Sequence, residues 1–115
     1  MHELGIASSV LEAVQTEAQR HPGARVSKIG LRIGELAGVD AEALCFCFAV
    51  LVRDTPWQPV ALEIESVPQR RACRICRHEF VVANHRPECP ICGSPESAFL
   101  AGDELEIVYL EMETS

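Results

Sequence analysis

Apolar residues near the start of the chain recur at steps of three and four positions, the spacing of one face of an α-helix. The stripe that they form consists of Leu4, Ile6, Ala7, Val10, Leu11, Ala13, Val14 and Ala18. This pattern predicts an amphipathic helix of about 16 residues. We expect the helix to end before Pro22 and Gly23, because both residues disfavour helical backbone.

Two further segments alternate apolar and polar residues, the period of a β-strand with one buried face. In residues 24–34, Ile29, Leu31 and Ile33 alternate with polar or small residues, and the segment 60–67 has the same alternation before Pro68. Both segments are therefore predicted strands, the first followed by a turn over residues 34–38.

A third predicted strand covers residues 104–112 and differs from the others because both of its faces are apolar. Its two interleaved sets are Leu105, Ile107 and Tyr109, and Val108, Leu110 and Met112. A strand with two apolar faces is typical of the centre of a sheet. We therefore expect it to be central or covered on both sides.

A second helix is predicted over residues 41–52, where Leu44, Phe48 and Leu51 share one side. Asp40 precedes it and is an expected N-cap. The helix is rich in apolar residues, so we expect it to be largely buried, with Cys45 and Cys47 as small core residues.

The elements occur in the order helix, strand, helix, strand, cysteine-rich segment, strand. The last strand has no core of its own and must rejoin the first two. The predicted fold class is α+β, with a small three-stranded mixed sheet and two helices. A zinc-ribbon-like module with two CxxC knuckles is inserted into it. The predicted domains are 1–68 with 99–115, and 69–98.

The two predicted domains also differ in net charge. The chain of 115 residues has 17 acidic and 10 basic residues and a net charge of −7. Residues 69–95 nevertheless contain five arginines against two glutamates, a local balance of +3, so the remainder carries −10. The acidic body disfavours binding to nucleic acid and to anionic membrane surfaces. The longest apolar run is too short to span a bilayer, and the first residues lack the pattern of a signal peptide, so we expect a cytoplasmic protein.

The cysteine-rich segment has the spacing of a closed metal site. Its two CxxC pairs, Cys73 with Cys76 and Cys89 with Cys92, are separated by twelve residues. Two such knuckles can supply four sulfur ligands to a tetrahedral Zn²⁺ ion. A redox pair, an iron–sulfur cluster and free thiols are the alternatives, and structural zinc is favoured in a cytoplasmic protein. We interpret His78 and His85, which lie inside this segment, as loop histidines.

The N-terminus offers a second kind of metal chemistry. A terminal amine, deprotonated backbone amides and the imidazole of His2 can close fused chelate rings in one plane. Square-planar nitrogen coordination selects Ni²⁺ or Cu²⁺. Met1 is expected to remain and to supply the amine, because it precedes a residue as large as histidine. Glu3 is also explained as an acid at a helix N-terminus, and Asp40 as an N-cap.

The combination resembles the HypA/HybF family, the nickel metallochaperones of [NiFe]-hydrogenase maturation. The residues that carry the resemblance are the N-terminal Met1-His2-Glu3-Leu4, the segment from Ile33 to Val39 and the two CxxC pairs. It covers essentially the whole chain. In some family members a histidine follows the last knuckle cysteine, where this chain has Gly93.

The resemblance implies nickel bound by the amine of Met1, the amide and imidazole of His2 and the amide of Glu3, with Asp40 as an additional contact. It implies zinc bound by Cys73, Cys76, Cys89 and Cys92. It also implies a GTPase of the HypB type and the hydrogenase large-subunit precursor as partners, and it leaves a homodimer open.

Two other functions are weighed against the metallochaperone. One is a zinc-ribbon adaptor that binds proteins and has an inert N-terminus. The other is an enzyme, which the sequence disfavours because it has neither a phosphate-binding glycine loop nor a nucleophile elbow. We predict a protein that is not an enzyme, with nickel as transient cargo and zinc as a structural ion.

Overall fold

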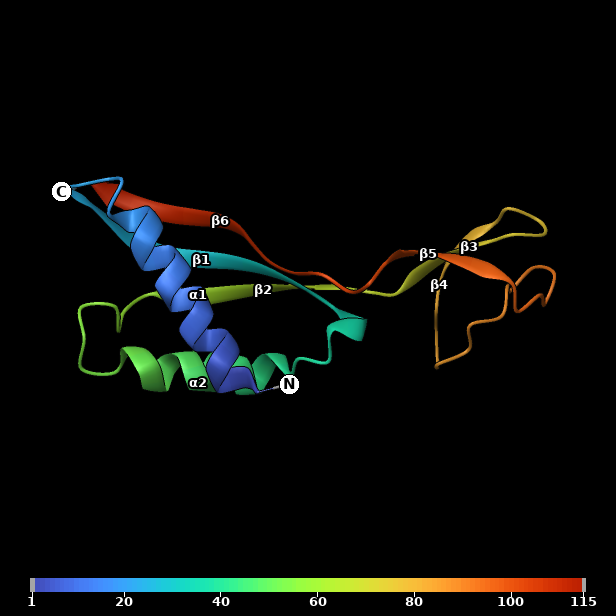
Figure 1. Cartoon of the computed structure of the whole chain (residues 1–115), viewed down its shortest axis with the longest axis horizontal. Helices are drawn as coiled ribbons and strands as arrows, with labels where there is room; N and C mark the ends of the chain where they lie inside the picture. Colours follow the sequence, from blue (N-terminus) through green and yellow to red (C-terminus); the bar gives the residue numbers. More distant parts are fainter. Residues whose placement is uncertain (1, 115) are drawn as a thin grey trace.

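The computed structural model describes residues 2–114. This range contains two α-helices, six strands and one short 3₁₀ helix. They are α1 (Glu3–Ala18), β1 (Ala24–Gly34), η1 (Glu35–Ala37), α2 (Ala41–Val52), β2 (Ala61–Val67), β3 (Arg70–Cys73), β4 (Glu79–Val81), β5 (Ser97–Ala101) and β6 (Leu105–Thr114). The molecule is elongated, 56 × 24 × 16 Å, with the two helices at one end and the β3–β5 region at the other (Figure 1).

The strands form two separate sheets. The first has the order β2-β1-β6, with β2 parallel and β6 antiparallel to the central β1. The second has the order β4-β3-β5 and is antiparallel throughout. This confirms the predicted α+β class, with two helices, a mixed three-stranded sheet and an inserted cysteine-rich unit. The expected boundary between residues 98 and 99 falls inside β5, because β5 pairs with β3 in the second sheet.

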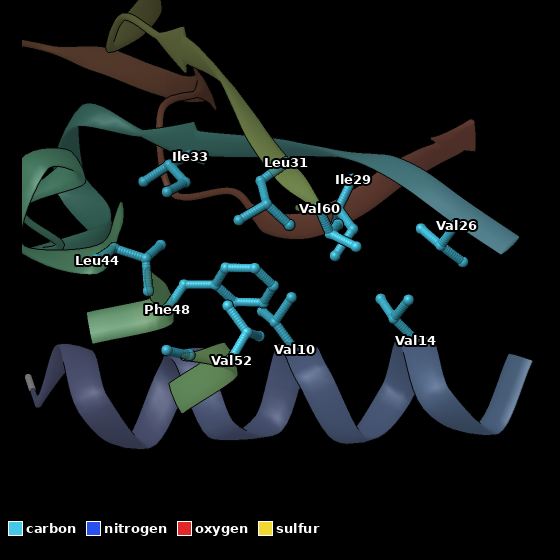
Figure 2. Packing of buried hydrophobic residues seen from close by; sticks show 11 residues of the cluster. Val10, Val14, Val26, Ile29, Leu31, Ile33, Leu44, Phe48, Val52 and Val60 are labelled. Atoms are coloured by element: carbon cyan, nitrogen blue, oxygen red, sulfur yellow. The ribbon is translucent and has the colours of Figure 1, made fainter. Parts of the chain in front are cut away.

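The core of the larger unit lies between the first sheet and the helices (Figure 2). Three alternate residues of β1, Ile29, Leu31 and Ile33, point into it and are almost completely buried. The ring of Phe48 from α2 lies between β1 and α1, and Val14 packs from α1. The predicted apolar faces of β1 and both helices are therefore confirmed, since they meet in one cluster.

The prediction for the last strand was wrong. β6 is an edge strand and is exposed along most of its length, whereas β1 is central. Its apolar residues also change face at a bulge: Gly30 pairs with Tyr109 and Leu31 with Ile107, so Val108 is the extra residue. A bulge shifts the alternation by one position. Apolar side chains before and after Val108 therefore lie on the same, helix-covered face of the sheet. In the sequence they fall into both alternating sets, which is why both faces of the strand were predicted to be apolar.

The second helix is less buried than expected. Only its side with Leu44, Phe48 and Val52 is buried, whereas Phe46 is 70% exposed and Val50 is 50% exposed. Cys47 is half-buried against the core, but Cys45 is exposed, so its prediction as a core residue was wrong. The reason is that α2 has only α1 and one sheet to pack against, which cover one side of it.

Two extended segments connect the sheets, and they meet the end of β1. The N–H of Gly34 donates to the carbonyl of Glu104 at 2.7 Å, and the Glu35 carboxylate accepts from the N–H of Gln69 at 3.2 Å. Gly102 has φ +127°, and a Cβ there would lie 2.7 Å from the Cα of Gln69. The two connecting segments therefore pass each other so closely that position 102 requires glycine. No helix in residues 2–114 is long and apolar enough to cross a membrane.

Candidate metal sites

Four cysteine side chains converge beside the second sheet. The Sγ atoms of Cys73, Cys76, Cys89 and Cys92 all lie within 4.8 Å of one another. Cys73 and Cys92 are separated by 3.5 Å between sulfurs, as are Cys76 and Cys89, and all four are free thiols. Tetrahedral zinc with Zn–S bonds of about 2.3 Å places its sulfurs about 3.8 Å apart. The donor set and its spacing therefore fit a four-thiolate metal site.

The two CxxC pairs fold into matching turns. The N–H of Arg77 donates to the carbonyl of Cys73 at 3.0 Å, and the N–H of Gly93 donates to that of Cys89 at 2.9 Å. Both residues that follow the pairs have left-handed backbone, with φ of 67° at Arg77 and 75° at Gly93. Glycine adopts this conformation freely, whereas arginine does so at a cost. The two CxxC segments therefore have the same local turn, closed by the same backbone hydrogen bond.

Backbone amides in these turns point at the sulfurs. The N–H groups of Ile75 and Cys76 approach the Sγ of Cys73 at 3.4 Å, and that of Ile91 approaches the Sγ of Cys89 at the same distance. The amide of Cys76 is the main cause that lowers the pKa of the Cys73 thiol to about 6, against an opposing effect of burial. Thiolate is the metal-binding form of cysteine, so this turn prepares its first sulfur for a metal.

The two histidines of the module lie outside the cluster. Within residues 2–114, the four cysteines are the only group of three or more metal-binding side chains that lie close enough together to share an ion, and neither histidine belongs to it. The His78 ring stacks on Phe80 with centroids 6.3 Å apart, and both His78 and His85 are exposed. Their interpretation as loop histidines agrees with these positions.

The starts of the two helices meet within the larger unit, near the middle of the molecule's long axis (Figure 1). His2 is exposed and occupies the N-cap position of α1, where its carbonyl accepts from the N–H of Ile6 at 3.2 Å. The carboxylate of Glu3 accepts from the N–H of Asp40 at 3.1 Å, which lowers the pKa of Glu3. Asp40 in turn accepts from the N–H of Ala43 at 3.1 Å, as expected of the N-cap of α2. Met1, the third expected nickel ligand, lies outside the described residues.

The structure thus brings Glu3 and Asp40 together, although they are 37 positions apart in the sequence. From the sequence, Glu3 was expected to be an acid at a helix N-terminus and to offer its backbone amide to nickel. The contact between its side chain and Asp40 was not predicted. The bond goes to a backbone N–H, which every residue except proline has. No pattern of residue types could have revealed it.

Comparison with known proteins identifies the family of this chain. Residues 1–112 match a family model described as "HypA: Hydrogenase/urease nickel incorporation, metallochaperone, hypA". Hydrogenase maturation factor HypA of Geobacter metallireducens is 40% identical, and hydrogenase maturation factor HybF of Klebsiella pneumoniae is 37% identical. Each is matched over 113 residues, which are 98% of this chain and 100% of the relative.

Two solved structures share the fold over the whole chain. The solution structure of the Ni metallochaperone HypA from Helicobacter pylori has a TM-score of 0.64 and 23% identity, and covers 100% of both chains. A second HypA solution structure has a TM-score of 0.70 and 22% identity, and 98% of it is covered. With a family model that spans residues 1–112 and relatives matched along their full length, the chain belongs to the HypA family of hydrogenase maturation factors.

Proposed function

We propose that this protein is a nickel metallochaperone that binds Ni²⁺ at its N-terminus and delivers it during [NiFe]-hydrogenase maturation. The observation that carries the proposal is the match of residues 1–112 to a family described by nickel incorporation. The exposed position of His2 at the start of α1 supports it, because a cargo ion must be reachable both for loading and for release.

The proposed nickel ligands are the amine of Met1, the amide and imidazole of His2 and the amide of Glu3, with Asp40 as an additional contact. The first backbone N–H groups of a helix have no partner within the helix, so these amides are available to a metal. Planar nitrogen donors favour Ni²⁺ over ions that prefer tetrahedral or oxygen-rich sites. Because backbone amides must lose a proton to bind, retention of nickel should weaken as the pH falls.

The proposed resident metal is structural zinc, held by Cys73, Cys76, Cys89 and Cys92. The buried cluster of this unit supports the assignment, because it consists of Cys73, Phe80, Val82 and Cys89 alone. So small a core leaves the metal to supply folding free energy. Four thiolates also fill a tetrahedral shell, which suits a structural site and leaves no position for substrate.

The remaining parts of the proposal concern the compartment, the partners and the division into two units. We expect the protein to act in the cytoplasm with a HypB-type GTPase and the hydrogenase large-subunit precursor, with a homodimer open. We expect no catalysis of its own. The sequence predicted units of residues 1–68 with 99–115 and residues 69–98. Because all of β5 pairs with β3, we propose that the zinc-binding unit extends to Ala101 and that the nickel-binding unit consists of residues 1–68 with 102–115.

Nickel titration of the untagged protein tests the proposal, with zinc measured in the same samples. His2→Ala should lose the terminal nickel site and keep its zinc. His21→Ala is the matched control, because His21 is also exposed and lies just beyond the other end of α1. A tag fused before Met1 should act like His2→Ala, since it removes the free amine. Full-strength nickel binding by His2→Ala would leave the alternative of a zinc-ribbon adaptor with an inert N-terminus.

A further inference from the structure

The outer side of α2 is apolar although it is exposed. In Figure 1, α2 forms the lower edge of the larger unit. The helix contains one charged residue, Glu42, and its other eleven residues are apolar. A helix that is hydrophobic all round is normally buried all round. Here the side with Leu44, Phe48 and Val52 is buried, whereas Phe46 on the outer side is 70% exposed. The composition of α2 thus fits a helix that a further surface covers.

Four exposed residues follow one another along the outer side of α2. They are Glu42, Phe46, Ala49 and Arg53, at steps of four, three and four positions. These steps keep side chains on one side of a helix and are the spacing of a helix–helix seam. Arg53 is the C-cap of α2 and lies about three turns from Glu42. We call these four residues the α2 stripe, which is acidic, large, small and basic in chain order.

The α2 stripe is complementary to a reversed copy of itself. When two copies of α2 pack antiparallel about a two-fold axis at the centre of the stripe, Glu42 lies opposite Arg53 of the second copy. Phe46 then lies opposite Ala49 of the second copy, so a large side chain meets a small one. Two-fold symmetry repeats both contacts. A parallel arrangement would place acid against acid and phenylalanine against phenylalanine. The order of the four residues therefore selects the antiparallel pair.

Both charges of the α2 stripe are available to a second copy. Neither Glu42 nor Arg53 has an ion-pair partner among residues 2–114, and both are exposed. The other two acids near the ends of α2 lie outside the stripe. Asp40 caps the helix by accepting from the N–H of Ala43, and Asp54 lies in the turn beyond the helix, with φ 62°. Antiparallel packing also brings the positive end of each helix dipole beside the negative end of the other.

We propose that two copies of this chain associate through their α2 stripes, with the helices antiparallel across a two-fold axis. A helix of 12 residues is about 18 Å long, and so short a contact belongs to the class of weak, transient interfaces. The dimer should therefore dissociate on dilution. Each copy carries a net charge of −7, but at about 0.15 M salt charges more than about 8 Å apart are largely screened. The proposal concerns this surface alone and does not depend on nickel.

The test measures self-association of the full, zinc-loaded chain by analytical ultracentrifugation, without nickel and with a reductant that prevents disulfides of Cys45. Glu42→Arg places base against base, and Arg53→Glu places acid against acid, so each should weaken the dimer about tenfold or more. In an equimolar mixture of the two variants, every base of one stripe faces an acid of the other. Association in the mixture should therefore return to about that of the unchanged protein, which would also show that both variants are folded.

Glu12→Arg is the matched control, because Glu12 is an exposed acid of α1 outside the stripe and the charge change is the same. It should leave association within about twofold, and mixing it with Arg53→Glu should restore nothing. Phe46→Ala should weaken the dimer about tenfold, since it removes the large side chain of each apolar contact. Three results would overturn the proposal: a monomer up to about 1 mM, a dimer that the stripe variants leave unchanged, or equal recovery in both mixtures.

Discussion

The carboxylate of Glu3 accepts a hydrogen bond from the backbone N–H of Asp40 at 3.1 Å and joins the first turn of α1 to the first turn of α2. The first residue of α1 is thereby held beside the N-cap of α2, although the two belong to different helices. For a metal site built from the backbone of the first residues, such a bond limits the positions that those amides can adopt.

We predict that Glu3→Ala weakens nickel binding several-fold, because the start of α1 loses its tether and must be ordered when the ion binds. Glu3→Gln should bind nickel nearly as well as the unchanged protein, since the side-chain carbonyl of glutamine can still accept from Asp40. Calorimetric titration of both variants checks this. Equal weakening in both would mean that the negative charge matters and the hydrogen bond does not.

Two substitutions of Asp40 can separate its role as the N-cap of α2 from its proposed role as a nickel contact. Asp40→Ala should lower the free energy of unfolding by about 1 kcal/mol, because α2 loses its N-cap. Asp40→Asn keeps a capping oxygen and should be close to the original stability in denaturant unfolding. If Asp40 also contacts nickel, Asp40→Asn should still bind the ion more weakly. Unchanged nickel affinity in that stable variant would restrict Asp40 to its structural role.

We expect Cys73→Ser to lose zinc and to unfold the second sheet, because two of the four residues in its buried cluster are cysteines of the metal site. The larger unit should remain folded. Trp57, the only tryptophan of the chain, packs against that unit's core, so its fluorescence should change little. Zinc analysis and amide exchange across residues 73–92 provide the readout.

Cys45→Ser is the control for this experiment. Cys45 is a free, exposed cysteine on α2, so the substitution changes the same chemical group away from the cluster. It should keep its zinc and its amide protection. Zinc loss of similar size in both variants would show that general thiol chemistry, rather than this site, holds the metal.

The outer face of the first sheet provides a pH-dependent prediction. The hydroxyl of Tyr109 donates to the Glu63 carboxylate at 2.6 Å, and this bond, with a smaller contribution from burial, raises the pKa of Tyr109 to about 12. The stabilisation from this bond should be complete below pH 10 and lost as the pH rises through 12. Tyr109 is the only tyrosine, so phenolate absorbance reports it directly.

Two variants should each return the pKa of Tyr109 toward 10, its ordinary value. Glu63→Gln replaces the charged acceptor with a neutral one. Gly30→Ala acts from the strand between them, because a Cβ at Gly30 would overlap the Tyr109 ring and displace it from Glu63. An unshifted titration near 12 in both variants would mean that the bond does not cause the raised pKa.

Local patterns were sufficient for much of the fold and for the cysteine site. The helical spacing of Val10 and Val14 and the alternation of Ile29 and Leu31 predicted their elements, and these residues now form the core. The CxxC spacing predicted that the four thiols converge, and their sulfurs lie within 4.8 Å. In each case the information lies within a few neighbouring residues, where the geometry of one turn or one strand determines which side chains share a face.

Relationships across the chain were decided only by the tertiary structure. The place of β6 at the edge, the bulge at Val108 and the exposure of Cys45 depend on which elements pack together, and composition does not specify this. The contact between Glu3 and Asp40 depends on the distance between two helix ends and uses a backbone donor that has no sequence signature. The sequence by itself thus determined the elements and the donor atoms of the cysteine cluster. Packing decided which surfaces stay exposed and which residues far apart in the chain meet.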